Sequence, residues 1–150
     1  MITYRQPMAL DIPTLVLLDK EYFPYSPWSP AQFKEEFAGI PSTRFFELAI
    51  SDNEIVGYVG VFAPGDGAVA DLLTVTVVNG FRRQGIAKKL ISDIESYCQT
   101  KGSSAIMLEV AVDNTDAISL YENLGYLQIS TRSNYYGSGK DALVMQKELI

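Results

Sequence analysis

The basic run from Arg82 to Lys89, RRQGIAKK, has the composition of an anion-binding loop. It holds four of the twelve lysines and arginines in a chain whose formal net charge is −6. It follows a β-branched stretch, 72–78, and precedes a helical pattern, so we expect it to open a helix. The free N–H groups of a first helical turn bind anions, and Gly85 lets a ligand approach the backbone closely. The sequence predicts a pyrophosphate site here, although a solvated helix start would have the same composition.

Two side chains further along the chain, Glu109 and Tyr121, could move protons in a common cleft. Glu109 lies on a predicted strand, 105–110, and Tyr121 lies on a predicted helix that begins at Asn114. A carboxylate can accept the proton of an amine, and a tyrosine with an ordinary pKa of about 10 can donate one. Structural roles explain the same residues: a solvent-facing glutamate, a core tyrosine and a helix-capping asparagine.

The absence of histidine limits the chemistry that is possible. It removes the commonest proton-transfer group together with the commonest transition-metal ligand, so triads built on histidine are excluded. A zinc site could draw only on carboxylates and the thiol of Cys98, which is a poor ligand set, and we expect no metal. The acidic balance also argues against nucleic-acid binding, which depends on a basic surface.

Apolar periodicity and turn residues predict the elements that would position these side chains. Ser29 and Pro30 are typical of a helix start, and Gly102 and Gly125 are typical of helix ends. Residues 52–54 join two strands in a predicted hairpin. The predicted strands are 2–5, 45–50, 55–62, 72–78, 105–110, 129–131 and 142–148, and the predicted helices are 7–20, 30–37, the segment from the basic run to Gly102, and 114–124.

Length and hydropathy favour a small cytoplasmic protein. The 150 residues are enough for one domain, which we expect to span 1–150. No apolar run approaches the roughly 18 residues that span a bilayer, so no membrane partner is expected. The start of the chain lacks the charged-then-apolar pattern of a secretory signal. Cys98 lies on the apolar stripe of a predicted helix, which favours a buried structural residue over a nucleophile.

Two motifs carry a resemblance to a known family. The loop 83–87, RQGIA, resembles the acyl-CoA pyrophosphate loop of the GNAT N-acetyltransferases, with the pattern Q/R-x-x-G-x-G/A. The stretch 108–126, LEVAVDNTDAISLYENLGY, resembles the second half of the GNAT core, with its N-x-x-A-x-x-L-Y-x-x-L-G-F/Y helix, and is more specific. Residues 23–29 and 132–136 further resemble the substrate-side segments of the RimI family. The likeness extends over nearly the whole chain.

The resemblance implies an α/β (α+β) GNAT fold, with a mixed, mostly antiparallel central sheet and helices on both faces. The implied order is β-α-α-β-β-β-α-β-α-β-β. It also implies direct acetyl transfer from acetyl-CoA, in a ternary complex, to the N-terminal α-amine of a protein. The RimI likeness indicates the N-terminal alanine of a small-subunit ribosomal protein as the acceptor. Nothing in the sequence sets the oligomeric state.

The resemblance also assigns roles to residues. Glu109 would be the general base, directly or through water, and Tyr121 would protonate the departing CoA thiolate. Backbone donors of the preceding strand would bind the acetyl oxyanion, so the departures at 78–80 and Ala87 from the usual family pattern are read as tolerated. The implied cofactor-binding residues are Val75, Thr76, Val77, Arg82, Arg83, Gln84, Gly85, Ile86, Ala87, Lys88 and Asn114.

Four aromatic residues are candidates for the wall that holds the acceptor peptide: Tyr25, Trp28, Tyr135 and Tyr136. Aromatic rings with polar tips suit a short extended chain, although packing between loops is the alternative, most of all for Trp28. Two other functions stay open. One is acetylation of a small amine such as a polyamine, an antibiotic or an amino acid. The other is a non-catalytic sensor that only binds acyl-CoA, which would not need Glu109 and Tyr121.

Overall fold

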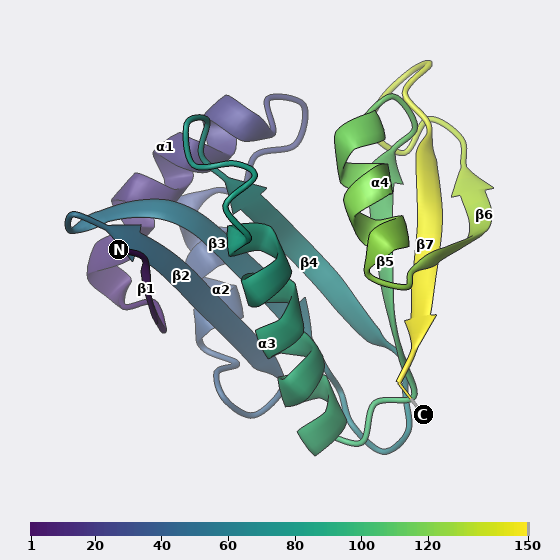
Figure 1. Ribbon diagram of the computed structural model, residues 1–150, viewed down its shortest axis with the longest axis horizontal. Coiled ribbons are helices and arrows are strands. Elements are labelled where there is room, and N and C mark those ends of the chain that lie inside the picture. Colours follow the sequence, from purple (N-terminus) through teal and green to yellow (C-terminus); the bar gives the residue numbers. More distant parts are fainter. Residues whose placement is uncertain (150) are drawn as a thin grey trace.

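The computed structural model describes residues 1–149 and contains a seven-stranded sheet with helices on both faces (Figure 1). The predicted order of elements is confirmed, with one added 3-10 turn, η1. The strands are β1 (Thr3–Arg5), β2 (Arg44–Ser51), β3 (Glu54–Phe62), β4 (Ala70–Val77), β5 (Ala105–Ala111), β6 (Leu127–Arg132) and β7 (Ala142–Glu148). The helical elements are η1 (Ala9–Asp11), α1 (Ile12–Tyr22), α2 (Pro30–Phe37), α3 (Ile86–Thr100) and α4 (Thr115–Asn123).

The sheet has the strand order β1-β2-β3-β4-β5-β7-β6, and only β4 and β5 run parallel. These two strands pair through Ala70 with Ile106 and Asp71 with Met107, and then diverge (Figure 1). β4 nevertheless stays paired with β3 as far as Val77. The backbone of β4 beyond Asp71 therefore has no strand partner on the side that faces β5, which leaves hydrogen-bonding groups free for another ligand.

A β-bulge lies at the point where β4 leaves β5. Gly60 of β3 faces Thr74, whereas the next residue, Val61, faces Leu72, so Leu73 has no partner. A bulge bends its strand and increases the local twist. The bend helps to separate β4 from β5 where the predicted site residues gather.

The face of the sheet that carries α3 and α4 holds the larger hydrophobic core. The predicted apolar stripe of α3 is confirmed, because Leu90, Ile91, Ile94 and Cys98 are all buried in it. Burial of each such side chain contributes about 1.5–3 kcal/mol. This packing fixes the start of α3, and with it the basic loop, against the sheet.

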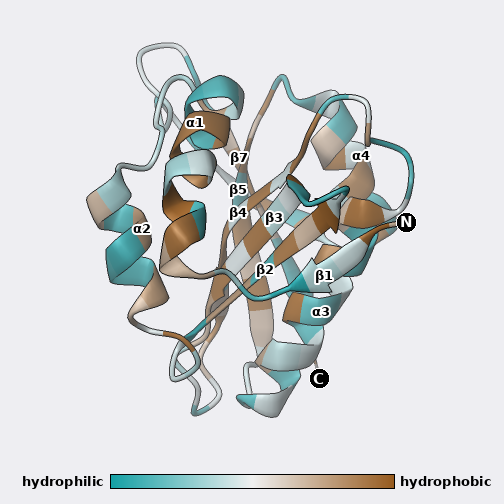
Figure 2. Cartoon of the chain, turned by 90° about the vertical axis from the view of Figure 1, so that its left-hand side faces the viewer, coloured by the Kyte–Doolittle hydropathy of each residue, from teal (hydrophilic) through white to brown (hydrophobic). Residues whose placement is uncertain are grey.

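The opposite face is covered by α1 and α2, which Figure 2 shows to the left of the hydrophobic strands β2 and β3, with α3 on the other side of the sheet. Their core includes Leu15, Phe33 and Tyr58. Asp19 is buried among them at 2% exposure. Its carboxylate accepts the hydroxyl of Tyr58 at 2.8 Å and the backbone N–H of Trp28 at 2.6 Å. These bonds fix the loop between α1 and α2 to the sheet.

The helix predicted from Pro7 begins later, at Ile12, so that boundary was wrong. Asp11 explains the difference, because it accepts two bonds from Arg5, at 2.8 and 2.9 Å, and one from the N–H of Met8 at 2.7 Å. These contacts hold the preceding segment in a 3-10 turn, and Pro13 then suits the first turn of α1.

The other predicted helix starts and the final strand are confirmed. Ser29 caps α2, with its hydroxyl accepting the N–H of Gln32 at 3.1 Å, and β7 has the predicted bounds. Within residues 1–149, no helix combines the length and the apolar character that crossing a membrane requires.

Candidate active site

The basic loop lies at the start of α3 and has the backbone shape of an anion cradle. Arg83 and Gly85 both have positive φ angles, of 62° and 80°. Gly85 is the N-cap of α3 and offers no side-chain cap, so the N–H groups of the first turn need another partner. A Cβ atom added at Gly85 would meet nothing within 4 Å, which means that the space before the helix start is open. The loop therefore fits a phosphate group.

The side chains of this loop divide into exposed and buried groups. Arg83, Gln84 and Lys88 are exposed, whereas Ile86 is 2% exposed and belongs to the core. Arg82 is also exposed, and its Nε donates to the carbonyl of Val77 at 3.1 Å. Ile86 can offer a ligand only its backbone, while the charged side chains remain available to phosphates.

The predicted oxyanion donors belong to the part of β4 that has separated from β5. Val75, Thr76 and Val77 all follow the last pair between β4 and β5. Thr76 is 6% exposed, and its side-chain Oγ1 has no hydrogen-bond partner within the described residues. Backbone groups alternate along a strand, and the N–H of Val78 donates to the carbonyl of Val56 on β3 at 2.9 Å. Thr76, two residues earlier, therefore also points its N–H at β3, whereas the N–H groups of Val75 and Val77 point away from β3 and are available to a carbonyl oxygen.

Glu109 faces a depression of about 350 Å³. Its Oε1 accepts the hydroxyl of Tyr135 at 3.1 Å, and the guanidinium of Arg132 lies 4.9 Å from the centre of the Tyr135 ring. The predicted substrate-side segment 132–136 thus contacts the strand that carries the proposed base, and Trp28 of the other segment lines the same depression. The depression is lined by Trp28, Asp71, Leu72, Leu73, Met107, Glu109, Arg132 and Tyr135.

Tyr121 lies on the face of the sheet opposite to the depression, where it packs with Leu108 and Val110 of β5. It is 6% exposed, belongs to the core under α3 and α4, and packs edge-on against Tyr126 at 5.9 Å. Burial, and then the nearby Tyr136, raise the pKa of Tyr121, so its hydroxyl stays protonated at neutral pH. Burial, followed by Tyr135 and Glu109, raises the pKa of Tyr136 to about 12. The Tyr136 ring packs edge-on against the ring of Tyr135 at 4.8 Å.

The remaining aromatic candidates differ in their surroundings. Trp28 packs on Phe33, with ring centres 5.0 Å apart, and also lines the depression. Its packing between loops is therefore compatible with the predicted role in the wall that holds the acceptor peptide. Tyr25 is 67% exposed, and Lys140 Nζ lies 4.5 Å from its ring centre. This contact brings the loop between α1 and α2 against the loop between β6 and β7.

Asn114 is the N-cap of α4. Its Oδ1 accepts the N–H of Ala117 at 3.2 Å, which is the capping interaction that the sequence left open. Its role toward a cofactor stays a prediction, as do the roles of the other site residues.

One acidic residue of the depression was missed from the sequence. Asp71 is half-buried on β4, and burial, followed by the charge of Glu109, raises its pKa. The predicted strand began one residue later, at Leu72, and so excluded it. The signal that could have found it is a lone carboxylate at the head of an otherwise apolar and β-branched run, ADLLTVTV.

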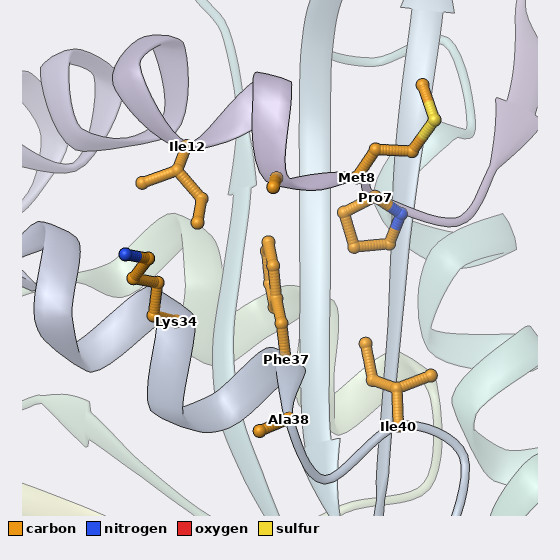
Figure 3. A pocket seen from close by; sticks show the side chains of 8 residues that line it. Pro7, Met8, Ile12, Lys34, Phe37, Ala38 and Ile40 are labelled. Atoms are coloured by element: carbon orange, nitrogen blue, oxygen red, sulfur yellow. The ribbon is translucent and has the colours of Figure 1, made fainter.

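A second pocket lies between the segment before α1 and the end of α2 (Figure 3). Its volume is about 390 Å³, and its lining is mainly apolar, with Ile12 and Phe37 among the residues in view. Among the residues that the structure describes, Lys34 is the only ionisable side chain in the lining, and no carboxylate or tyrosine faces the pocket. We therefore assign the proton-transfer chemistry to the smaller depression beside Glu109.

Comparison with known proteins identifies related sequences and folds. The model of the acetyltransferase (GNAT) family matches residues 12–126. An uncharacterized protein of Mycobacterium leprae is 32% identical over 142 residues, which cover 92% of this chain and 38% of that protein. A [ribosomal protein bS18]-alanine N-acetyltransferase of Haemophilus ducreyi is 40% identical over 80 residues, which cover 51% of this chain and 55% of that enzyme. The chain thus spans about two fifths and about half of the lengths of these relatives.

The fold is also found in a solved structure from a plant. Arabidopsis thaliana NAA60, in complex with acetyl-CoA, has a TM-score of 0.88 and 20% sequence identity to this chain. The match covers 99% of this chain and 98% of the plant protein.

Proposed function

The chain belongs to the acetyltransferase (GNAT) family, and from this premise we propose that it transfers the acetyl group of acetyl-CoA to the N-terminal α-amine of a protein. The acceptor that we propose is the N-terminal alanine of a small-subunit ribosomal protein, which would locate the reaction in the cytoplasm. The observation that carries the proposal is the depression in which Glu109 meets Tyr135 and Trp28. The name of the Haemophilus relative supports the same acceptor.

The basic loop and β4 form the proposed binding site for acetyl-CoA. The first-turn N–H groups of α3 and the side chains of Arg83 and Lys88 would bind the pyrophosphate. The free edge of β4 would pair with the amide groups of the pantetheine arm, as a strand pairs with an added strand. The open space before Gly85 supports this assignment, because nothing there blocks the backbone donors.

Glu109 would begin the reaction by accepting a proton from the acceptor. An α-amine has an ordinary pKa of about 7.7–8.0, so much of it arrives as ammonium at neutral pH. Proton transfer to the Glu109 carboxylate leaves a neutral amine, whose nitrogen attacks the thioester carbonyl carbon and forms the new C–N bond. The backbone N–H groups of Val75 and Val77 would stabilise the negative oxygen that results.

Tyr121 would complete the reaction. When the carbon–sulfur bond breaks, the sulfur leaves as a thiolate and takes the proton of the Tyr121 hydroxyl. The nitrogen, which became positively charged when it attacked, gives up its second proton through water to the resulting tyrosinate, so a neutral amide remains and the Tyr121 hydroxyl is restored. Burial raises the pKa of that hydroxyl, so it is fully protonated before the reaction. Direct transfer is favoured over an acetyl-enzyme because the chain's one thiol, Cys98, is fully buried, and burial raises its pKa to about 11.

Acetylation of a small polycationic amine is the second candidate. Two carboxylates, Asp71 and Glu109, face the depression, and the formal net charge of the chain is −6. Both features suit a polyamine or an aminoglycoside as well as a peptide α-amine.

The deciding experiment measures CoA release from acetyl-CoA together with the mass of the product. One reaction contains a peptide that begins with the alanine of the ribosomal protein, and parallel reactions contain polyamines and aminoglycosides. Acetylation of the peptide α-amine is the expected result. Acetylation of the small amines alone would replace the proposed acceptor, and binding of acetyl-CoA without any transfer would favour the non-catalytic sensor.

A further inference from the structure

Asp71 is placed beside the proposed base by the short parallel pairing of β4 and β5. It pairs with Met107, and Glu109 lies two residues further along β5. Paired residues and their second neighbours point to the same face of a sheet, so the side chains of all three face one side. All three line the same depression. Two carboxylates from neighbouring strands therefore line the same side of the depression.

We propose that Asp71 determines specificity by binding the protonated α-amine of the acceptor together with Glu109. The inference rests on the proposed function, because it assigns a ligand to the same depression. Its ligand is the ammonium group itself, before Glu109 removes the proton.

Asp71 has no positively charged partner among the described residues. It takes part in none of the four salt bridges among the described residues. Three other charged or titratable groups face the depression: Glu109 from β5, Arg132 from β6 and Tyr135 from the loop after it. The Arg132 guanidinium lies over the Tyr135 ring and is paired with neither carboxylate. An ammonium group between Asp71 and Glu109 would neutralise the pair and offer each a charge-assisted hydrogen bond.

The proton balance gives Asp71 and Glu109 different tasks. The ammonium proton goes to Glu109, and the neutral nitrogen then attacks the thioester carbon. Asp71 keeps its charge and needs no proton during the step. The product is an amide without a positive charge, so Asp71 attracts the substrate and not the product. This difference predicts a depression that holds free amines and releases acetylated ones.

Trp28 allows this preference to be measured directly. It is the one tryptophan of the chain and it lines the depression, so its fluorescence reports occupancy of the site. Two peptides of the same sequence, one with a free α-amine and one already N-acetylated, are titrated into the protein. We expect wild type to bind the free amine about tenfold more tightly than the acetylated peptide.

Variants at Asp71 test whether it supplies that preference. Asp71→Asn keeps the shape of the side chain and should abolish most of the tenfold preference, while Asp71→Glu should restore part of it. Asp71→Thr is a second neutral variant that suits a strand if the amide disturbs folding. Asp52→Asn is the matched control, since Asp52 is exposed in the turn between β2 and β3. In kinetics, Asp71→Asn should raise KM for the acceptor about tenfold with little change in kcat.

The outcomes separate this inference from the proposed function. Equal binding of the two peptides by wild type, or an unchanged preference in Asp71→Asn and Asp71→Thr, would overturn the role of Asp71. The proposed function is tested separately, by acetyl transfer to the peptide in wild type. It can therefore stand when the role of Asp71 fails.

Discussion

The two sides of the site are built from different parts of the chain. The proposed cofactor side consists of β4, the basic loop and α3, which are consecutive in sequence and offer mainly backbone N–H groups. The acceptor side draws side chains from the loop before α2, from β4 and β5, and from the segment after β6. A backbone site tolerates many substitutions as long as its shape is kept, whereas a side-chain site depends on individual charges. Acceptor-side variants should therefore change acceptor binding or proton transfer, and cofactor-side variants should change acetyl-CoA binding.

The largest effect is expected from Glu109→Gln. Glutamine can still accept the hydroxyl of Tyr135 but cannot take up the amine proton, so kcat/KM for the acceptor should fall by about 10²–10⁴-fold. Affinity for acetyl-CoA should be unchanged in a calorimetric titration. Activity that stays close to wild type would remove Glu109 from the role of base.

Tyr121→Phe should have the next largest effect, with kcat lowered about 10²-fold because the thiolate loses its proton donor. Tyr126→Phe is the matched control, since its ring packs on Tyr121 while its hydroxyl donates to Glu95 at 2.9 Å. That control should lower stability and leave kcat close to wild type. Equal kcat values in the two variants would show that Tyr121 acts only through packing.

Gly85→Val should weaken acetyl-CoA binding about tenfold or more and leave acceptor binding unchanged. The φ angle of Gly85 is +80°, which a β-branched residue adopts only at a cost of about 1–3 kcal/mol. Gly67→Val is a control with almost the same strain, because its φ angle is +81° and the space around it is also open. Both variants should melt earlier, but only the change at Gly85 should affect the dissociation constant for acetyl-CoA. An equal loss in both would point to general destabilisation.

The difference between the two sides of the site also explains which parts of it could be predicted from the sequence. The backbone arrangement of the proposed cofactor side could be predicted because a strand, a glycine-containing loop and an amphipathic helix follow one another, and each has a local signal. Asp71 and the buried Asp19 could not, since their importance depends on contacts between segments that are distant in sequence. The late start of α1 has a similar cause, because the contacts from Arg5 to Asp11 override the helical pattern that begins at Pro7.

The smallest effect on activity is expected for Glu47→Gln, which tests the anchoring of α3 rather than either side of the site. Burial, and then the neighbouring Asp93 of α3, raise the pKa of Glu47 to about 8, although Lys89 opposes the shift. An unfolded glutamate has a pKa of about 4.3, so the folded state holds the extra proton between these values. The stability contributed by the protonated Glu47 is complete at low pH and is lost as the pH rises through about 8.

Glu47→Gln should therefore melt at a higher temperature than wild type at pH 9, by on the order of a few degrees. The difference should shrink near pH 6, where wild-type Glu47 is protonated. Glu54→Gln serves as the control because Glu54 is exposed on β3, and it should show no such dependence on pH. Identical melting of wild type and Glu47→Gln at both pH values would contradict a buried, protonated Glu47.

Two matched peptides can show whether the acceptor is an α-amine. Both begin with alanine and contain one lysine. In the first only the α-amine is free, and in the second only the lysine ε-amine is free. An ε-amine has a pKa of about 10.4, so it holds its proton more firmly than an α-amine with a pKa of about 7.7–8.0. The mass of each product is measured after incubation with acetyl-CoA. We expect acetylation of the first peptide alone, whereas acetylation of the second alone, or of neither, would overturn the assignment of an α-amine acceptor.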